Sequence, residues 1–168
     1  WLQILIVALV TIILVFTFVG RITPVVGESM LPTLHEGDVM LIRDIGYTDP
    51  QPGDIVVLTK EFDAARGPIV KRIIAVEGQT VDIDYQTGTV YVDGEALDEP
   101  YLNEPMEEPW YEDLTSVTVP EGSVFVMGDN RNHSNDSRDV TLGTVDTRYL
   151  LGKAEFICFP FSDFGRIG

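Results

Sequence analysis

The sequence predicts a mostly β fold with a single N-terminal transmembrane helix. An uncharged apolar run occupies the N-terminus, and most of the remaining chain consists of short segments rich in β-branched and aromatic residues, separated by turn-forming sequences. No long stretch after the apolar run has helical apolar periodicity. A chain of 168 residues is expected to form one compact domain besides this helix.

The N-terminal run, LQILIVALVTIILVFTFV (residues 2–19), is long enough to span a membrane. It carries no charge, and its polar residues are Gln3, Thr11 and Thr17. A membrane span needs about 18 apolar residues, whereas the apolar region of a cleaved signal peptide usually has about 7–15. No A-x-A cleavage pattern follows the run. We therefore expect residues 1–20 to be a retained anchor, and a cleaved signal peptide is the alternative.

The segments that follow have the composition of β-strands, with turn signals such as DPQPGD, YQTG and PEG between them. The expected strands are residues 38–42, 54–59, 68–77, 80–84, 89–93, 116–120, 123–127 and 153–159. Residues 94–115 differ, because they contain three prolines and many acidic residues. We expect a small acidic insert at about residues 82–121, whose charges are either simply solvated or form a binding surface.

The composition argues against nucleic acids and metal ions as partners. The chain has 27 acidic and 11 basic residues, a formal charge of −16, and such a surface repels phosphates. The single cysteine, Cys158, cannot form an internal disulfide, and no cluster of Cys and His indicates a metal site. We expect neither a nucleic acid nor a metal to bind.

Ser29, in the segment VVGESMLPTLHEGD, is the candidate nucleophile. A serine hydroxyl needs a neighbouring base to remove its proton, and His35 or His133 could supply a Ser-His pair. Lys71 is the better candidate, because both faces of its segment, PIVKRIIAVE, are mainly apolar. Burial would lower the pKa of this lysine and make it a general base. The alternative is that Lys71 reaches solvent or pairs with an acid.

A third segment, VMGDNRNHSNDSRD (residues 126–139), is dense in side chains that form hydrogen bonds. Such side chains can hold a loop rigid beside a catalytic pair, or they can cap a turn that has no part in chemistry.

Together, these segments resemble the type I signal peptidases of bacteria, which are membrane-anchored Ser-Lys endopeptidases. The resemblance rests on GESMLPTL, GDIVVL, KRIIAVEGQTV, GDNRNHSNDSR and LGTVDTRYLLGKAEFICFPFSDFG, which follow the apolar run in this order. It implies the complex β fold shared by signal peptidases and LexA-like proteases. The short soluble part resembles the compact Gram-positive version.

The resemblance implies roles for individual residues. Ser29 is expected to be the nucleophile and Lys71 the general base, with the hydroxyl of Ser134 orienting the lysine amine. The loop is expected to be held by its own polar residues, Asp129, Asn130, Arg131, Asp136 and Arg138.

The resemblance also describes the cleft around the nucleophile. Met30 is expected to line the substrate cleft, and the backbone amide of Ser29 to supply one oxyanion donor. Some relatives have a serine or threonine two residues before the nucleophile, whose hydroxyl completes the oxyanion hole. This chain has Gly27 there, so a backbone N–H or a water must substitute.

The implied function is removal of signal peptides from exported preproteins as they emerge from the translocase, without a cofactor. The implied location is the plasma membrane, with a single-pass anchor and residues 21–168 outside the cytoplasm. Membrane lipid is an expected partner. The stretch FICFPFSDF (residues 156–164) either contacts lipid or forms the last strand of the core.

Two other functions agree with parts of the sequence. A non-cleaving relative that serves as an assembly chaperone, for example for pili, is expected to lack Ser29 or Lys71, and both are present. A LexA-like Ser-Lys autoprotease is soluble and carries a DNA-binding region, whereas this chain has an apolar N-terminal run and an acidic surface.

Overall fold

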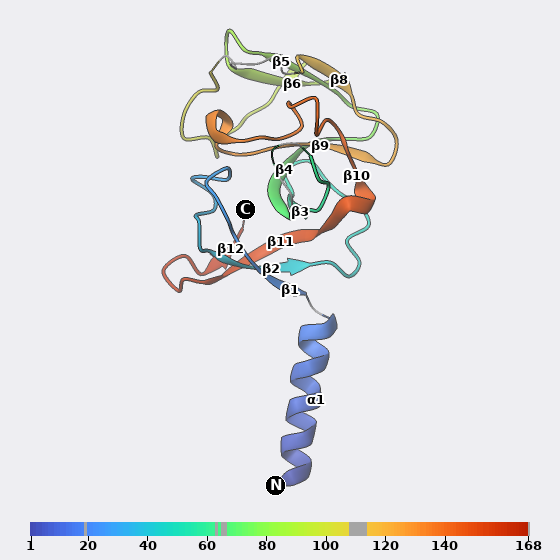
Figure 1. Ribbon diagram of the computed structural model, residues 1–168, viewed down its shortest axis with the longest axis vertical. Helices are drawn as coiled ribbons and strands as arrows, with labels where there is room; N and C mark the ends of the chain where they lie inside the picture. Colours follow the sequence, from blue (N-terminus) through green and yellow to red (C-terminus); the bar gives the residue numbers. More distant parts are fainter. Residues whose placement is uncertain (19, 63, 65–66, 108–113, 168) are drawn as a thin grey trace.

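A computed structural model describes residues 1–18, 20–62, 64, 67–107 and 114–167. One N-terminal helix precedes two antiparallel sheets (Figure 1). The helix and the strands of the larger sheet are α1 (Leu2–Phe18), β1 (Arg21–Pro24), β2 (Val39–Arg43), β3 (Ile55–Leu58), β4 (Ile69–Val76), β9 (Ser123–Met127), β10 (Val145–Asp146), β11 (Leu150–Phe159) and β12 (Gly165–Arg166). The smaller sheet contains β5 (Thr80–Asp84), β6 (Thr89–Val92), β7 (Glu95–Ala96) and β8 (Ser116–Thr118). Two short 3₁₀ helices are η1 (Arg131–His133) and η2 (Thr147–Tyr149).

The larger sheet has the strand order β1-β2-β11-β3-β4-β9-β10, with β12 paired to β11. Its strands do not follow the order of the chain, because β11 lies between β2 and β3. At Gly152 of β11 the backbone of β2 approaches so closely that a Cβ atom would lie 2.5 Å from the carbonyl oxygen of Arg43. Only glycine fits this crossing without a shift of the backbone.

The smaller sheet, in the order β7-β6-β5-β8, lies at the end of the domain remote from α1 (Figure 1). Its alternation of apolar and polar residues explains why only one face is buried, as in β6, where Val90 and Val92 are buried and their neighbours are half-exposed. The buried residues of both sheets meet in one apolar cluster that includes Phe125 and Met127 of β9. This contact fixes the smaller sheet against β4 and β9.

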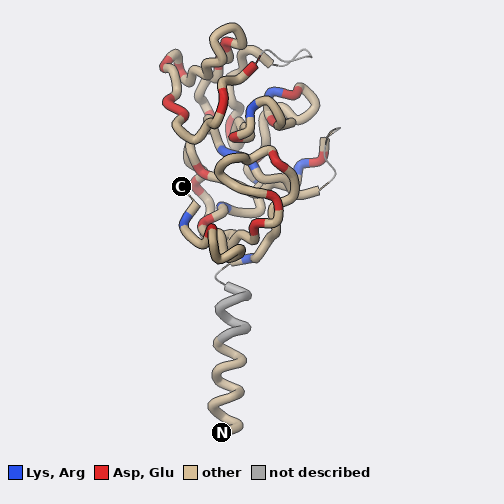
Figure 2. Tube along the Cα trace, turned by 90° about the vertical axis from the view of Figure 1, so that its left-hand side faces the viewer, with Lys and Arg blue, Asp and Glu red and all other residues tan. Residues whose placement is uncertain are grey.

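Each strand range expected from the sequence contains a strand in the structure. The predicted acidic insert includes most of the smaller sheet, and its residues 108–113 lie outside the described residues. Strands β1, β7, β10 and β12 were not predicted, because two to four residues are too few to show a period. Figure 2 shows acidic residues distributed over the strands and loops beyond α1.

Helix α1 has 17 residues and ends at Phe18, shortly before β1 begins at Arg21. In the described part of the chain, no helix reaches the combination of length and apolarity that crossing a membrane requires.

Candidate active site

Ser29 lies in the turn between β1 and β2. The turn is closed at its base, where the N–H of Val25 donates to the carbonyl oxygen of Asp38 over 2.7 Å. Its apolar side chains Met30 and Leu34 are buried in the core beneath β2, which leaves Ser29 half-buried at the surface of the turn. The local sequence thus holds the small polar residue Ser29 at the surface by burying its apolar neighbours Met30 and Leu34.

The structure brings Lys71 to Ser29. Lys71 Nζ lies 2.6 Å from Ser29 Oγ and donates to the carbonyl oxygen of Val70 over 3.0 Å. The lysine is only 3% exposed, so the alternative in which it reaches solvent is wrong. The pKa of Lys71 is lowered to about 8, mainly by burial; Asp136 and Asp129 oppose the shift, and Arg138 adds to it.

The two histidines are exposed and are not involved in this contact. His35 lies at the far end of the turn, and the hydrogen bond that involves its backbone goes to Asp38. His133 ends the 3₁₀ helix η1, immediately before Ser134. Neither is recorded as a hydrogen-bond partner of Ser29 among the residues that the structure describes.

The loop after β9 folds around the buried carboxylate of Asp136. This carboxylate accepts hydrogen bonds from Gly128 N over 2.9 Å and Ser134 Oγ over 2.7 Å, and Arg138 Nε donates to it over 2.8 Å. Burial alone would raise the pKa of Asp136, but Arg138 and these hydrogen bonds outweigh it, so the pKa lies below its ordinary value. The Ser134 hydroxyl therefore donates its proton to Asp136, and its expected role in orienting the lysine amine stays a prediction.

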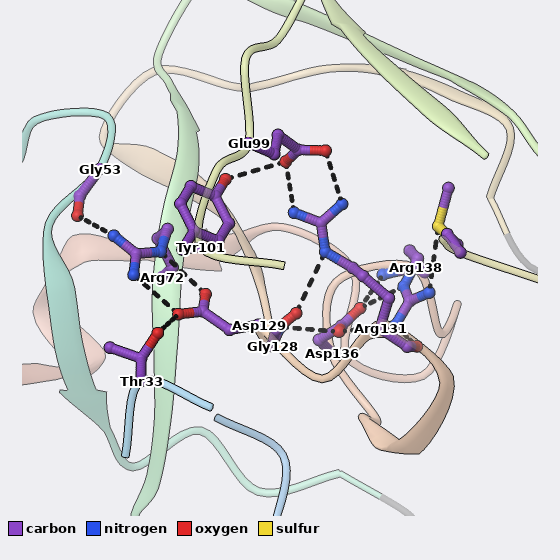
Figure 3. Close-up of polar contacts among 11 residues, drawn as sticks. Thr33, Gly53, Arg72, Glu99, Tyr101, Gly128, Asp129, Arg131, Asp136 and Arg138 are labelled. Carbon is purple, nitrogen blue, oxygen red and sulfur yellow. Dashed lines mark hydrogen bonds and ion pairs between the residues drawn. The ribbon is translucent and has the colours of Figure 1, made fainter. Parts of the chain in front are cut away.

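Asp129 joins the three segments that carry the site (Figure 3). Its carboxylate binds the Arg72 guanidinium with two hydrogen bonds, of 2.8 and 2.7 Å, and also accepts one from the hydroxyl of Thr33. Arg72 follows Lys71 in β4, and Thr33 belongs to the turn of Ser29. One buried carboxylate thus links the turn, the strand and the loop.

Asn130 fixes the loop directly to the nucleophile. Its N–H donates to the carbonyl oxygen of Ser29, and its Nδ2 donates to that of Glu28, both over 3.0 Å. Arg131 binds within the loop, where its Nε donates to the carbonyl oxygen of Gly128 over 3.1 Å. All of the predicted loop residues are therefore buried within one network.

The structure places the two residues that were expected at the cleft, Met30 and Gly27. The side chain of Met30 is 1% exposed and packs with Val25 and Leu34, so it lies beneath the site and not on its surface. Gly27 has a φ of +86°, a conformation that favours glycine, and no heavy atom lies within 4 Å of the position that its Cβ would take. The half-buried Gly27 therefore leaves open space beside Ser29.

Gly128 is a contact point that the sequence did not reveal. A Cβ atom at this position would lie 2.3 Å from Ser134 Oγ and 2.5 Å from the carbonyl oxygen of Ser29. We expect Gly128→Ala to displace the loop from the nucleophile and to lower kcat by about 10²-fold, the effect of a misplacement of about 1 Å. Steady-state cleavage assays would measure this, with Gly122→Asn as the control, because Gly122 is half-buried in the turn before β9 and has open space at its Cβ position. Wild-type kcat in Gly128→Ala would contradict it.

Thr33, Glu99 and Tyr101 also belong to the network and were missed by sequence reasoning. Thr33 binds Asp129, Glu99 binds Arg131 and Tyr101 stacks on Arg72. These partners are 96, 32 and 29 positions away in the sequence, so no local pattern could identify them. The only signal was a cluster of proline and acidic residues around Glu99. In the described residues, no group of three His, Cys, Asp or Glu side chains is arranged to hold a metal ion.

Comparison with known proteins identifies relatives over nearly the whole chain. The family model described as "Signal peptidase, peptidase S26" matches residues 1–159. A "Probable signal peptidase I-1" of Synechocystis sp. is 41% identical over 98% of this chain and 84% of its own length. The "Signal peptidase I" of Bacillus licheniformis is 36% identical over 97% of this chain and 89% of its own length.

A solved structure has the same fold. The crystal structure of a signal peptidase I from Enterococcus faecalis V583 is 33% identical, with a TM-score of 0.50, and the match covers 63% of this chain and 97% of that one. The order of the motifs, the contact between Ser29 and Lys71 and these relatives lead to one conclusion: the chain belongs to the signal peptidase family, peptidase S26.

Proposed function

We propose that the protein removes signal peptides from exported preproteins, with Ser29 as the nucleophile and Lys71 as the general base. Family membership supports signal-peptide removal by a serine peptidase. The observation that carries the assignment of residues is the 2.6 Å contact between Ser29 Oγ and the amine of a buried lysine. A lysine with a pKa of about 8 is neutral often enough near neutral pH to accept a proton.

The proposed reaction needs no group beyond these side chains and water. Neutral Lys71 takes the proton of Ser29 Oγ while Oγ attacks the carbonyl carbon of the scissile bond. When the C–N bond breaks, the Lys71 ammonium gives this proton to the leaving amine. Water then attacks the acyl-serine ester, Lys71 accepts a proton from the water, and Ser29 regains its hydroxyl proton as the signal peptide leaves.

Strand β4 offers an edge for an extended substrate beside the nucleophile. Its pairing with β9 begins at Arg72, while Ile69, Val70 and Lys71 are paired with β3 on the other side. An extended peptide can add to such an edge by backbone hydrogen bonds. The open space at Gly27 would admit the scissile residue, with the backbone N–H of Ser29 as an oxyanion donor.

The function is tested by incubating the detergent-solubilised protein with a radiolabelled preprotein. We expect one cut at the end of the signal peptide, identified by N-terminal sequencing of the product, and no cut by the Ser29→Ala variant. Cleavage at scattered positions, or equal cleavage by Ser29→Ala, would exclude the proposed function.

The rate should depend on pH through the lysine amine. The neutral form is the active one, so kcat/KM should rise with pH, with its midpoint near the pKa of about 8. Below that pH the rate should fall in proportion to the neutral fraction. Measuring kcat/KM for a soluble peptide from pH 5 to pH 10 checks this, and a profile already flat from pH 5 upward would contradict it.

We further propose that residues 2–19 anchor the enzyme in the plasma membrane, with residues 21–168 outside the cytoplasm. The run is uncharged, and α1 stands apart from the sheets in Figure 1. Four exposed phenylalanines support contact of the domain with lipid, at the end of β11 and in the segment after it: Phe156, Phe159, Phe161 and Phe164. The same strand also contributes buried Ala154 and Ile157 to the core. The exposed residues of this stretch are therefore available to lipid, while its buried residues belong to the last core strand.

Cell fractionation tests whether residues 2–19 anchor the protein. Alkaline carbonate should leave the full chain in the membrane pellet, because the apolar run stays inserted. Protease added to spheroplasts should digest residues 21–168, and a cytoplasmic marker protein should survive as the control. Recovery of only a soluble chain that lacks the apolar run would show that the run is a cleaved signal peptide.

A further inference from the structure

A strap, which we define as residues 99–107, crosses from the smaller sheet to the loop that carries Ser134. It follows β7, and Figure 3 shows its residues Glu99 and Tyr101 beside Arg131 and Arg72. Its far end is fixed by Met106, which is 4% exposed and packs in the cluster between the two sheets. Asn132 of the loop binds this end, donating to Glu104 over 3.0 Å and to the carbonyl oxygen of Pro105 over 3.1 Å.

Glu99 at the near end of the strap pairs with Arg131 of the loop. The two side chains are joined by two hydrogen bonds, one of them 3.0 Å long, and are 8% and 1% exposed. The same guanidinium donates to the carbonyl oxygen of Gly128 through Nε. A fork-to-carboxylate pair of this kind fixes direction as well as distance. Glu99 therefore holds the arginine that supports the start of the loop.

Glu99 also completes the charge balance of the buried network. Three ion pairs lie close together, and in each both partners are almost fully buried. The partners are Arg72 with Asp129, Arg131 with Glu99, and Arg138 with Asp136. Without the Glu99 charge, one guanidinium in this cluster would be uncompensated, which a buried site tolerates poorly.

Tyr101 connects this pair to the strand of the base. Its ring lies over the Arg72 guanidinium, with Cζ 4.0 Å from the ring centroid, and its hydroxyl donates to Glu99 over 2.9 Å. Burial, and next the charge of Glu99, raise the pKa of Tyr101 above its ordinary value, so the hydroxyl keeps the proton that it donates. Arg72 is the residue after Lys71.

We infer that the strap is a positioning element for the catalytic pair: Glu99 and Tyr101 hold Arg131 and Arg72, and through them the loop at Gly128 and the strand at Lys71. The inference rests on the proposed function, which it deepens. Neither Glu99 nor Tyr101 contacts Ser29 or Lys71 in the recorded hydrogen bonds of the described residues, so both act through other side chains. The acidic insert therefore does more than carry solvated charges, because its residues Glu99 and Tyr101 hold the site in place.

The test compares Glu99→Gln with Glu95→Gln, the same change at an exposed position of the same insert. Assays are run on the full-length protein well below the melting temperature of each variant, so that every chain is folded. We expect kcat of Glu99→Gln to fall by about 10²-fold, since a shift of about 1 Å at the pair has this effect. KM should change less than about twofold, because the substrate edge of β4 is intact, and Glu95→Gln should match the wild type.

Tyr101 separates the two contacts of the strap. Tyr101→Phe keeps the ring over Arg72 and loses the hydroxyl bond to Glu99, whereas Tyr101→Leu loses both. We expect kcat to be highest in the wild type, lower in Tyr101→Phe and lowest in Tyr101→Leu. Equal kcat for wild type and Tyr101→Leu would overturn the part of the inference that concerns Arg72.

Hydrogen–deuterium exchange tests the strap without any substrate. Amides of residues 128–138 should exchange faster in Glu99→Gln than in wild type or Glu95→Gln, while those of β3 and β11 should not change. Wild-type exchange in this loop, or wild-type kcat in Glu99→Gln, would overturn the inference. If the wild type itself cleaved no preprotein, the proposed function would fail, and the exchange data would still decide whether the strap holds the loop.

Discussion

Replacing either Ser29 or Lys71 by alanine is expected to reduce preprotein cleavage by about 10⁴-fold or more, the scale seen when a nucleophile or its base is removed from a serine protease. The 2.6 Å contact between Oγ and Nζ makes the two side chains one chemical unit. The double variant should therefore be little slower than either single variant.

The measurement is single-turnover cleavage of a preprotein, with circular dichroism to show that each variant is folded. His35→Ala and His133→Ala are the controls, because both histidines are exposed and belong to the two segments around the site. If Lys71→Ala kept most of its activity while one of the histidine variants lost it, the base would be that histidine.

The largest effect on stability is expected from Asp129→Ala. Both partners of the Arg72–Asp129 pair are nearly inaccessible, with side-chain exposures of 5% and 1%. Removing the carboxylate leaves a buried guanidinium without its counter-charge, which costs about 3–5 kcal/mol of unfolding free energy. Thr33 loses its acceptor in the same variant. Asp129→Asn, which keeps the shape and an acceptor oxygen, should lie between wild type and Asp129→Ala.

Urea unfolding in detergent, followed by near-ultraviolet circular dichroism, would measure this loss. The control is Asp146→Ala, which breaks the pair with Arg148 on the surface, where the arginine side chain is 86% exposed. Solvent screens that pair, and the variant otherwise loses only the cap of η2, so the unfolding midpoint should move much less than in Asp129→Ala. Equal midpoints for Asp129→Ala and Asp146→Ala would show that the buried pair does not stabilise the fold.

Much of the site could be predicted from local features of the sequence. The strand ranges were identified from β-branched residues and turn signals, both of which act over a few residues. The burial of Lys71 followed from the apolar residues on both faces of its strand, and the structure confirms it at 3% exposure. Ser29 was identified as the candidate nucleophile from its segment, and its place in the turn between β1 and β2 comes from the structure.

The partners within the network could not be predicted in this way. The hydrogen bond from the Ser134 hydroxyl to Asp136, two residues away, was not predicted, because it arises where the loop curls around that carboxylate. The bonds from Asp129 to Arg72 and from Glu99 to Arg131 join positions 57 and 32 residues apart. Such pairs are set by the order of strands in the sheets, which single-sequence periodicity does not contain.

The place of β11 in the larger sheet determines when the newly made chain can fold into its active form. Strands β1 and β2 flank the turn of Ser29, and β4, which carries Lys71, pairs with β3. In the part of the chain that the structure describes, strand pairing joins these two halves only through β11. A growing chain that has passed residue 71 already contains both reactive side chains, but the strand that sets them in register is made some 80 residues later. Contacts so distant in sequence form late in folding. The protease should therefore stay inactive during its own synthesis, and gain activity only as the last long strand, β11, enters the sheet.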